Sequence, residues 1–85
     1  MYDPYENTPT ATVYDVFADT ATRLAGLFVH LSDTAPTAEE REEWWRKVMA
    51  LRDAKRAVPA RDREQLMVHI ERWRGELARL EGDPA

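Results

Sequence analysis

Cysteine is absent from the 85 residues of this sequence, which excludes disulfide bonds and thiolate metal sites. Histidine is scarce: His30 and His69 are 39 positions apart, so no short spacing of metal ligands exists. The only serine, Ser32, closes a predicted helix two residues from His30, and the three glycines are too isolated to form a phosphate loop. We interpret both histidines as structural or solvent-facing. The sequence therefore predicts a protein that is not an enzyme and holds no metal and no cofactor.

Long apolar runs are also missing. No uncharged segment approaches the roughly 20 residues of a membrane span, and residues 1–9 carry no apolar run of the kind that a signal peptide needs. We therefore expect a cytoplasmic protein with no membrane partner. The net charge of −4 comes entirely from residues 1–37, which hold five acids and one base. An acidic balance disfavours non-specific binding to nucleic acid or to an anionic membrane.

The segment around which the rest of the chain is organised is residues 10–32. Placed on a helix at about 100° per residue, its apolar side chains cover an arc of roughly 220°. A helix with one neighbour needs an apolar stripe only a little wider than 100°, so this helix should contact at least two others. Thr8 and Pro9 form a reasonable start, since threonine can cap a helix and proline is tolerated in its first turn.

Two further helices are predicted. Thr37 and Glu40 have the spacing of a capping box, which indicates a second helix over residues 38–56. Val58-Pro59 then interrupts the helical pattern, because proline removes a backbone donor and constrains the preceding residue. A tight turn here is favoured over one long helix kinked at Pro59, although the apolar spacing permits both. Asp62 and Gln65 could form a second capping box, so the third helix covers residues 60–81 and begins between Pro59 and Asp62.

Together these features predict an all-α protein, an antiparallel up-down-up three-helix bundle with the first helix central and most buried. Residues 9–82 form this bundle, preceded by an extended arm (residues 1–8) and followed by a short tail (residues 83–85). The predicted core consists of large apolar residues at helical spacing: Phe17, Leu24, Phe28, Leu31, Trp44, Val48, Leu51, Leu66, Ile70, Trp73 and Leu77.

Apolar surface exceeds what two neighbouring helices can cover. The first helix carries a shoulder of small residues at Ala18, Ala25 and Val29, while Trp45 and Met49 lie off the apolar stripe of the second helix. Small residues permit close helix approach, and Trp and Met are enriched where proteins bind proteins. The predicted function is therefore a helical protein–protein interaction module that binds a partner chain or itself, most simply as a homodimer.

A cluster of bases around Pro59 supports the alternative, a DNA-associated regulator. Its members are Arg52, Lys55, Arg56, Arg61 and Arg63. Such a cluster could contact phosphates, but bases also suit the negative end of the second helix dipole. Helix-turn-helix proteins usually have shorter helices and a glycine in the turn, so nucleic acid is the less favoured partner.

Overall fold

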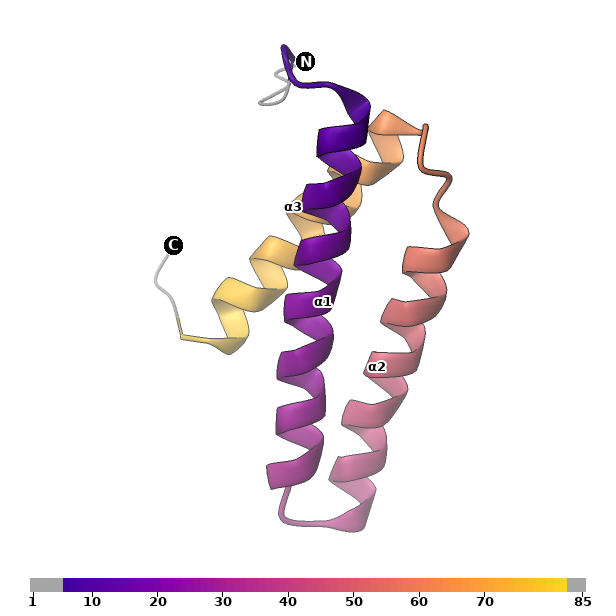
Figure 1. The fold of residues 1–85 in the computed structure, drawn as a ribbon. Helices are drawn as coiled ribbons and strands as arrows, with labels where there is room; N and C mark the ends of the chain where they lie inside the picture. Colours follow the sequence, from indigo (N-terminus) through magenta and orange to yellow (C-terminus); the bar gives the residue numbers. More distant parts are fainter. Residues whose placement is uncertain (1–5, 83–85) are drawn as a thin grey trace.

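The computed structural model describes residues 6–82, which form three helices: α1 (Thr10–Thr34), α2 (Ala38–Ala57) and α3 (Arg63–Leu80) (Figure 1). Helices account for 82% of this part of the chain, and it contains no strand. The predicted all-α class is confirmed. Residues 1–5 of the predicted arm and the predicted tail lie outside the described residues.

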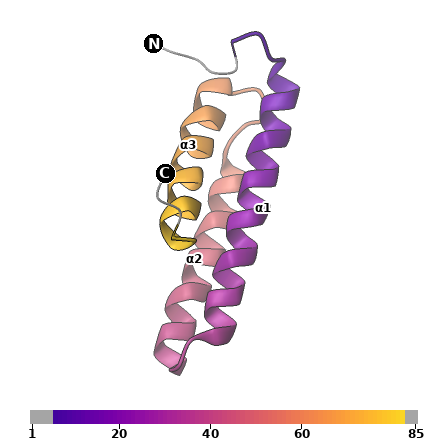
Figure 2. The same cartoon turned by 90° about the vertical axis from the view of Figure 1, so that its left-hand side faces the viewer.

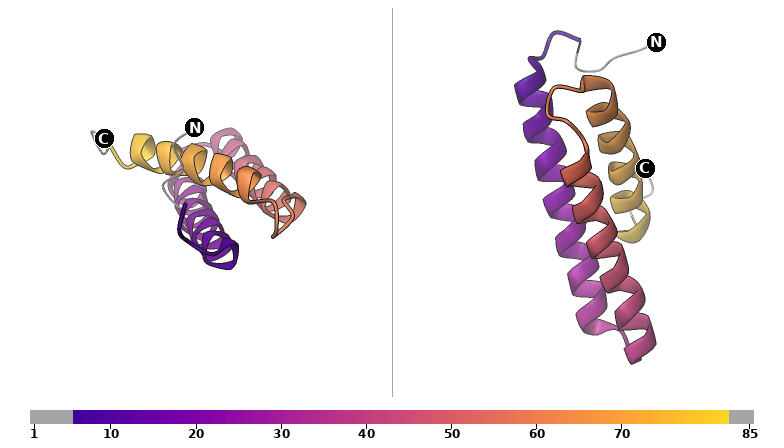
Figure 3. Two further views of the ribbon diagram at one scale, coloured as in Figure 1. Left: turned by 90° about the horizontal axis from the view of Figure 1, so that it is seen from above. Right: turned by 90° about the vertical axis from the view of Figure 1, so that its right-hand side faces the viewer.

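Helix α1 packs against both other helices, as predicted. Helix α2 runs antiparallel to α1, and α3 begins beside the start of α1 and crosses it obliquely (Figures 1 and 2). No Cα atom of α2 lies within 8 Å of a Cα atom of α3. The two helices diverge from the turn that joins them, and the right-hand view of Figure 3 shows both on the same side of α1. Helix α1 is therefore the common neighbour of the other two helices.

The start of α1 differs from the prediction. Its N-cap residue is Pro9, whose carbonyl oxygen accepts hydrogen bonds from the backbone N–H groups of Thr12 and Val13 at 3.0 and 3.1 Å, and no side chain caps this end. Instead, the Arg63 guanidinium donates to the Thr8 carbonyl oxygen at 2.7 Å and to the Thr10 hydroxyl at 3.3 Å. The first residue of α3 thus fixes the entry into α1.

Helices α2 and α3 begin at the N-cap residues that the sequence predicted, Thr37 and Asp62. The Thr37 side chain accepts a hydrogen bond from the Glu40 backbone N–H, and the Asp62 side chain accepts one from the Gln65 N–H. The Asp62 cap places the first residue of α3 at Arg63, directly after the predicted range of starts between Pro59 and Asp62. The favoured break at Pro59 is confirmed, because α2 ends at Ala57.

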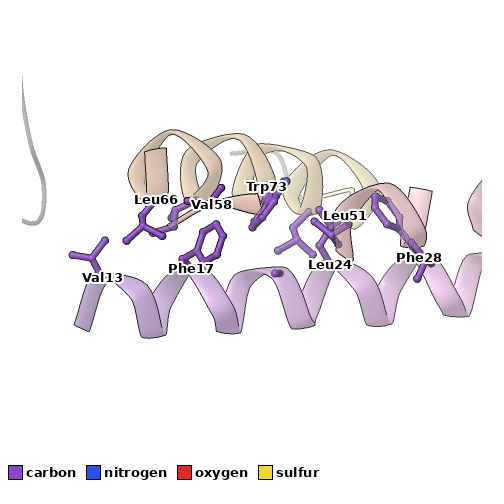
Figure 4. Close-up of a cluster of buried hydrophobic side chains, with 12 residues drawn as sticks. Val13, Phe17, Leu24, Phe28, Leu51, Val58, Leu66 and Trp73 are labelled. Carbon is purple, nitrogen blue, oxygen red and sulfur yellow. The ribbon is translucent and has the colours of Figure 1, made fainter. Parts of the chain in front are cut away.

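The core lies along one side of α1. Figure 4 shows Val13, Phe17, Leu24 and Phe28 directed from α1 toward the other helices. Nine of the predicted core residues are buried: Phe17, Leu24, Phe28, Val48, Leu51, Leu66, Ile70, Trp73 and Leu77. Among the described residues, three buried hydrophobic residues were not predicted: Val13, Ala21 and Val58.

Two predicted core residues were assigned incorrectly. Leu31 and Trp44 are only half-buried. Both lie at the end of the α1–α2 pair that is remote from the start of α3, and α3 turns away from α1 before reaching it (Figure 1). Helix periodicity predicts which residues share a face, but it does not predict how far along the axis a neighbour continues.

Candidate functional site

The predicted interface residues lie on α1 and α2. Trp45 and Met49 are 48% and 41% exposed, whereas Ala18, Ala25 and Val29 are half-buried. The shoulder of α1 is therefore partly covered, and the open apolar surface comes mainly from the two large side chains of α2. Along with Val68 on α3, these are the large apolar residues that the described part of the chain leaves exposed.

An open groove of about 250 Å³ lies on the α3 side of the α1–α2 pair. Its apolar floor includes Leu24, Phe28 and Trp73, and α2 contributes Ala50 and Ala54. The groove exists because α2 and α3 diverge and leave a strip of α1 between them.

The predicted interface faces away from this groove. At about 100° per residue, Trp45 and Met49 lie roughly 140° around α2 from the groove residues Ala50 and Ala54. On α1, the shoulder residues lie roughly 100° around the helix from the groove residues Leu24 and Phe28. The side of α1 that contacts α2 lies between the groove residues and the shoulder. Both rotations lead away from α3. The face that holds Ala18, Ala25, Val29, Trp45 and Met49 is called the outer face below.

Most of the charges that border the apolar centre of the outer face are separated by helix. On α1, exposed acids border the shoulder; we call Asp15, Asp19 and Asp33 the acidic row. On α2, exposed arginines lie around Trp45 and Met49; we call Arg41, Arg52 and Arg56 the basic row. The exposed acids Glu42 and Asp53 lie beyond Met49, on the edge of α2 that is remote from α1. No ion pair within 4.0 Å joins the two rows in the structure. The uneven charge distribution is visible in the sequence, but only the pairing of α1 with α2 places the two rows side by side.

Charged groups also line the groove. The ammonium group of Lys47 lies 6.0 Å from the centre of the Phe28 ring and 5.9 Å from that of Trp44. Glu76 is hydrogen-bonded to Arg79, which, with a further contribution from Lys47, lowers the pKa of the Glu76 carboxyl. The groove is thus an apolar strip with a mixed-charge rim.

The bases around Pro59 differ in exposure. Arg52, Arg56 and Arg61 are exposed, whereas Lys55 and Arg63 are half-buried. The hydrogen bonds of Arg63 to Thr8 and Thr10 give this side chain a structural role.

The polar residues considered for chemistry are dispersed. The Ser32 hydroxyl is buried and donates to the carbonyl oxygen of Arg41, while His30 is exposed. The rings of His69, Phe17 and Trp73 pack against one another, and the Nδ1 atom of His69 is buried without a hydrogen-bond partner. Within residues 6–82, no group of three or more acids and histidines is arranged to hold a metal ion.

Comparisons of the chain with protein-family models, curated proteins and solved structures give no match. In the portion described by the structure, no helix has both the length and the apolar character needed to cross a membrane.

Proposed function

We propose that the protein is a non-enzymatic helical interaction module that binds another protein chain through its outer face. The observation that carries this proposal is the exposure of Trp45 and Met49, two large apolar side chains one helical turn apart on α2. Tryptophan and methionine are enriched in protein interfaces, and half-exposed examples beside a small-residue shoulder provide an apolar centre for docking.

The surroundings of these two residues support the same function. Ala25 and Val29 pack against the core and still present part of their surface, so an approaching helix would meet short side chains there. Charged residues border the apolar centre, which is the usual arrangement of an interface with a polar rim. The function requires no bound metal or cofactor.

Isolation of the tagged protein from its native host, with chemical cross-linking, tests this proposal. We expect a species larger than the monomer that contains either a second copy or another protein. Trp45→Glu should abolish it, because a buried unpaired carboxylate is costly at an interface. The control is Val68→Glu, which places the same charge at a residue that is 50% exposed on α3.

Both substitutions should leave the free energy of unfolding of the isolated chain, measured by urea denaturation, within about 0.5 kcal/mol of wild type, as expected for exposed positions. Recovery of a monomer alone, or equal loss of the complex in both variants, would contradict an interaction role for the outer face.

A further inference from the structure

We infer that the occupant of the outer face is a second copy of this chain, arranged about a twofold axis parallel to α1 and α2. This inference rests on the proposed function, which leaves the partner open. It is carried by the charge separation on the outer face: the acidic row belongs to α1 and the basic row to α2.

The two rows match in level along the helix axes. The Ser32 hydroxyl donates to the Arg41 carbonyl oxygen at 3.0 Å, and the ring centres of Phe28 and Trp44 are 5.9 Å apart, which fixes the register of α1 against α2. With a rise of 1.5 Å per residue, Asp33 lies near the level of Arg41.

The same rise extends the match to the other end of the hairpin. Asp19 is then about 3 Å from the level of Arg52, and Asp15 about 3 Å from that of Arg56. Each acid therefore has an arginine near its own level on the neighbouring helix.

A twofold axis parallel to the helices preserves these levels while exchanging the helices. The α1 helix of one copy then faces the α2 helix of the other. The acidic row of each copy faces the basic row of the other copy, so this pairing occurs twice in the dimer. By the same registration, Val29 falls about 1.5 Å from the level of Trp45, and Ala25 about 1.5 Å from that of Met49. The large exposed apolar side chains of each copy thus meet the small side chains on α1 of the other copy.

The alternative twofold axis, perpendicular to the helices, places α1 on α1 and α2 on α2. Acids would then face acids and arginines would face arginines, and such juxtaposition disfavours association. The parallel axis instead yields four helices whose neighbours are all antiparallel, which is the arrangement of an ordinary four-helix bundle. Helix α3 of each copy lies outside this bundle because it packs on the side of α1 that is opposite the outer face.

Reciprocal charge reversal tests the inference by sedimentation equilibrium of the purified chain at micromolar concentration. The wild type should be a dimer whose association weakens from low salt to roughly 0.5 M NaCl. The variant Asp15→Lys/Asp19→Lys and the variant Arg52→Glu/Arg56→Glu should each associate at least about tenfold more weakly, because each brings like charges together.

An equimolar mixture of the two variants should recover a dimer, because every reversed lysine then faces a reversed glutamate and every native acid a native arginine. The control Glu64→Lys/Glu71→Lys makes the same change in net charge as Asp15→Lys/Asp19→Lys, but at exposed positions of α3, and should dimerise as the wild type does. Circular dichroism of each variant checks that the helices are retained.

A monomeric wild type, insensitivity to both reversals, or a mixture that stays monomeric would overturn the inference. The proposed function is tested separately. If the pure chain is monomeric but forms a Trp45-dependent complex with a different protein, the interaction role is retained and the second copy is excluded as the partner.

Discussion

The hydroxyl of Ser32 donates a hydrogen bond to the carbonyl oxygen of Arg41, 3.0 Å away, across the loop between α1 and α2. Ser32 is buried, and Arg41 belongs to the first turns of α2. The bond therefore joins the end of one helix to the start of the next, and it gives the single serine of the chain a structural role.

Substitution of Ser32 by Ala should lower the free energy of unfolding by about 1 kcal/mol, the usual net value of an intramolecular hydrogen bond. Thr34→Ala is the matched control, because its exposed hydroxyl donates to the His30 carbonyl oxygen within the same helix. Urea denaturation followed by circular dichroism measures both. Equal effects would contradict a special role for the bond between helices.

Leu24→Ala should reduce stability by about 2–5 kcal/mol, because the side chain is buried against both other helices and its removal leaves a cavity. Val68→Ser, at a residue that is 50% exposed on α3, should change stability by no more than about 0.5 kcal/mol. A thermal or urea unfolding experiment that finds equal losses would show that the core is misassigned.

Stability should fall as the pH drops below about 6.5, the ordinary pKa of histidine, because of His69. Burial of its ring, with a smaller contribution from Arg72, lowers the pKa of His69 in the folded protein. Between the lowered value and the ordinary one, the unfolded chain binds the proton more readily, so protonation favours unfolding. Above that window the ring is neutral in both states and no stability is lost.

His69→Phe should remove this slope while keeping a ring beside Phe17 and Trp73. His30→Gln should keep the slope, and urea midpoints measured between about pH 5 and 8 compare the variants. That range avoids the loss of the Glu76–Arg79 interaction, whose carboxyl has a lowered pKa and titrates below its ordinary value of 4.5. An unchanged slope in His69→Phe would assign the effect to another group.

Duplex DNA should not bind at physiological salt. The bases around Pro59 are divided between exposed side chains and the structural Arg63, and the chain carries a net charge of −4. Fluorescence anisotropy with a labelled duplex measures this directly. A signal that weakens steeply with salt and disappears in Arg56→Ala/Arg61→Ala would instead favour the DNA-associated alternative, because phosphate contacts release counterions.

Local sequence signals predicted the helices well. The side chains of Thr37 and Asp62 accept the capping hydrogen bonds that their spacing indicated, and Pro59 separates α2 from α3. The wide apolar arc of α1 correctly indicated a helix with two neighbours, because burial on several sides leaves few positions for charges.

Features that depend on crossing geometry were not predictable. Val58 precedes a proline and lies outside any helix, so periodicity gave no reason to place it in the core, yet it is buried. The oblique path of α3 leaves Leu31 half-buried. The rows of opposite charge on the outer face could be recognised only once the register of α1 against α2 was known.

The absence of close approach between α2 and α3 divides the molecule into two mechanical parts. The α1–α2 hairpin is continuous in sequence, whereas α3 returns to it over a separation of 55 residues, as the Arg63–Thr8 hydrogen bond illustrates. Detachment of α3 separates its backbone from that of α1 and leaves the hairpin register intact. Native-state hydrogen exchange should therefore resolve α3 as the first unit to open. A chain in that open state would still present the whole outer face, so association could precede the final closure of the fold.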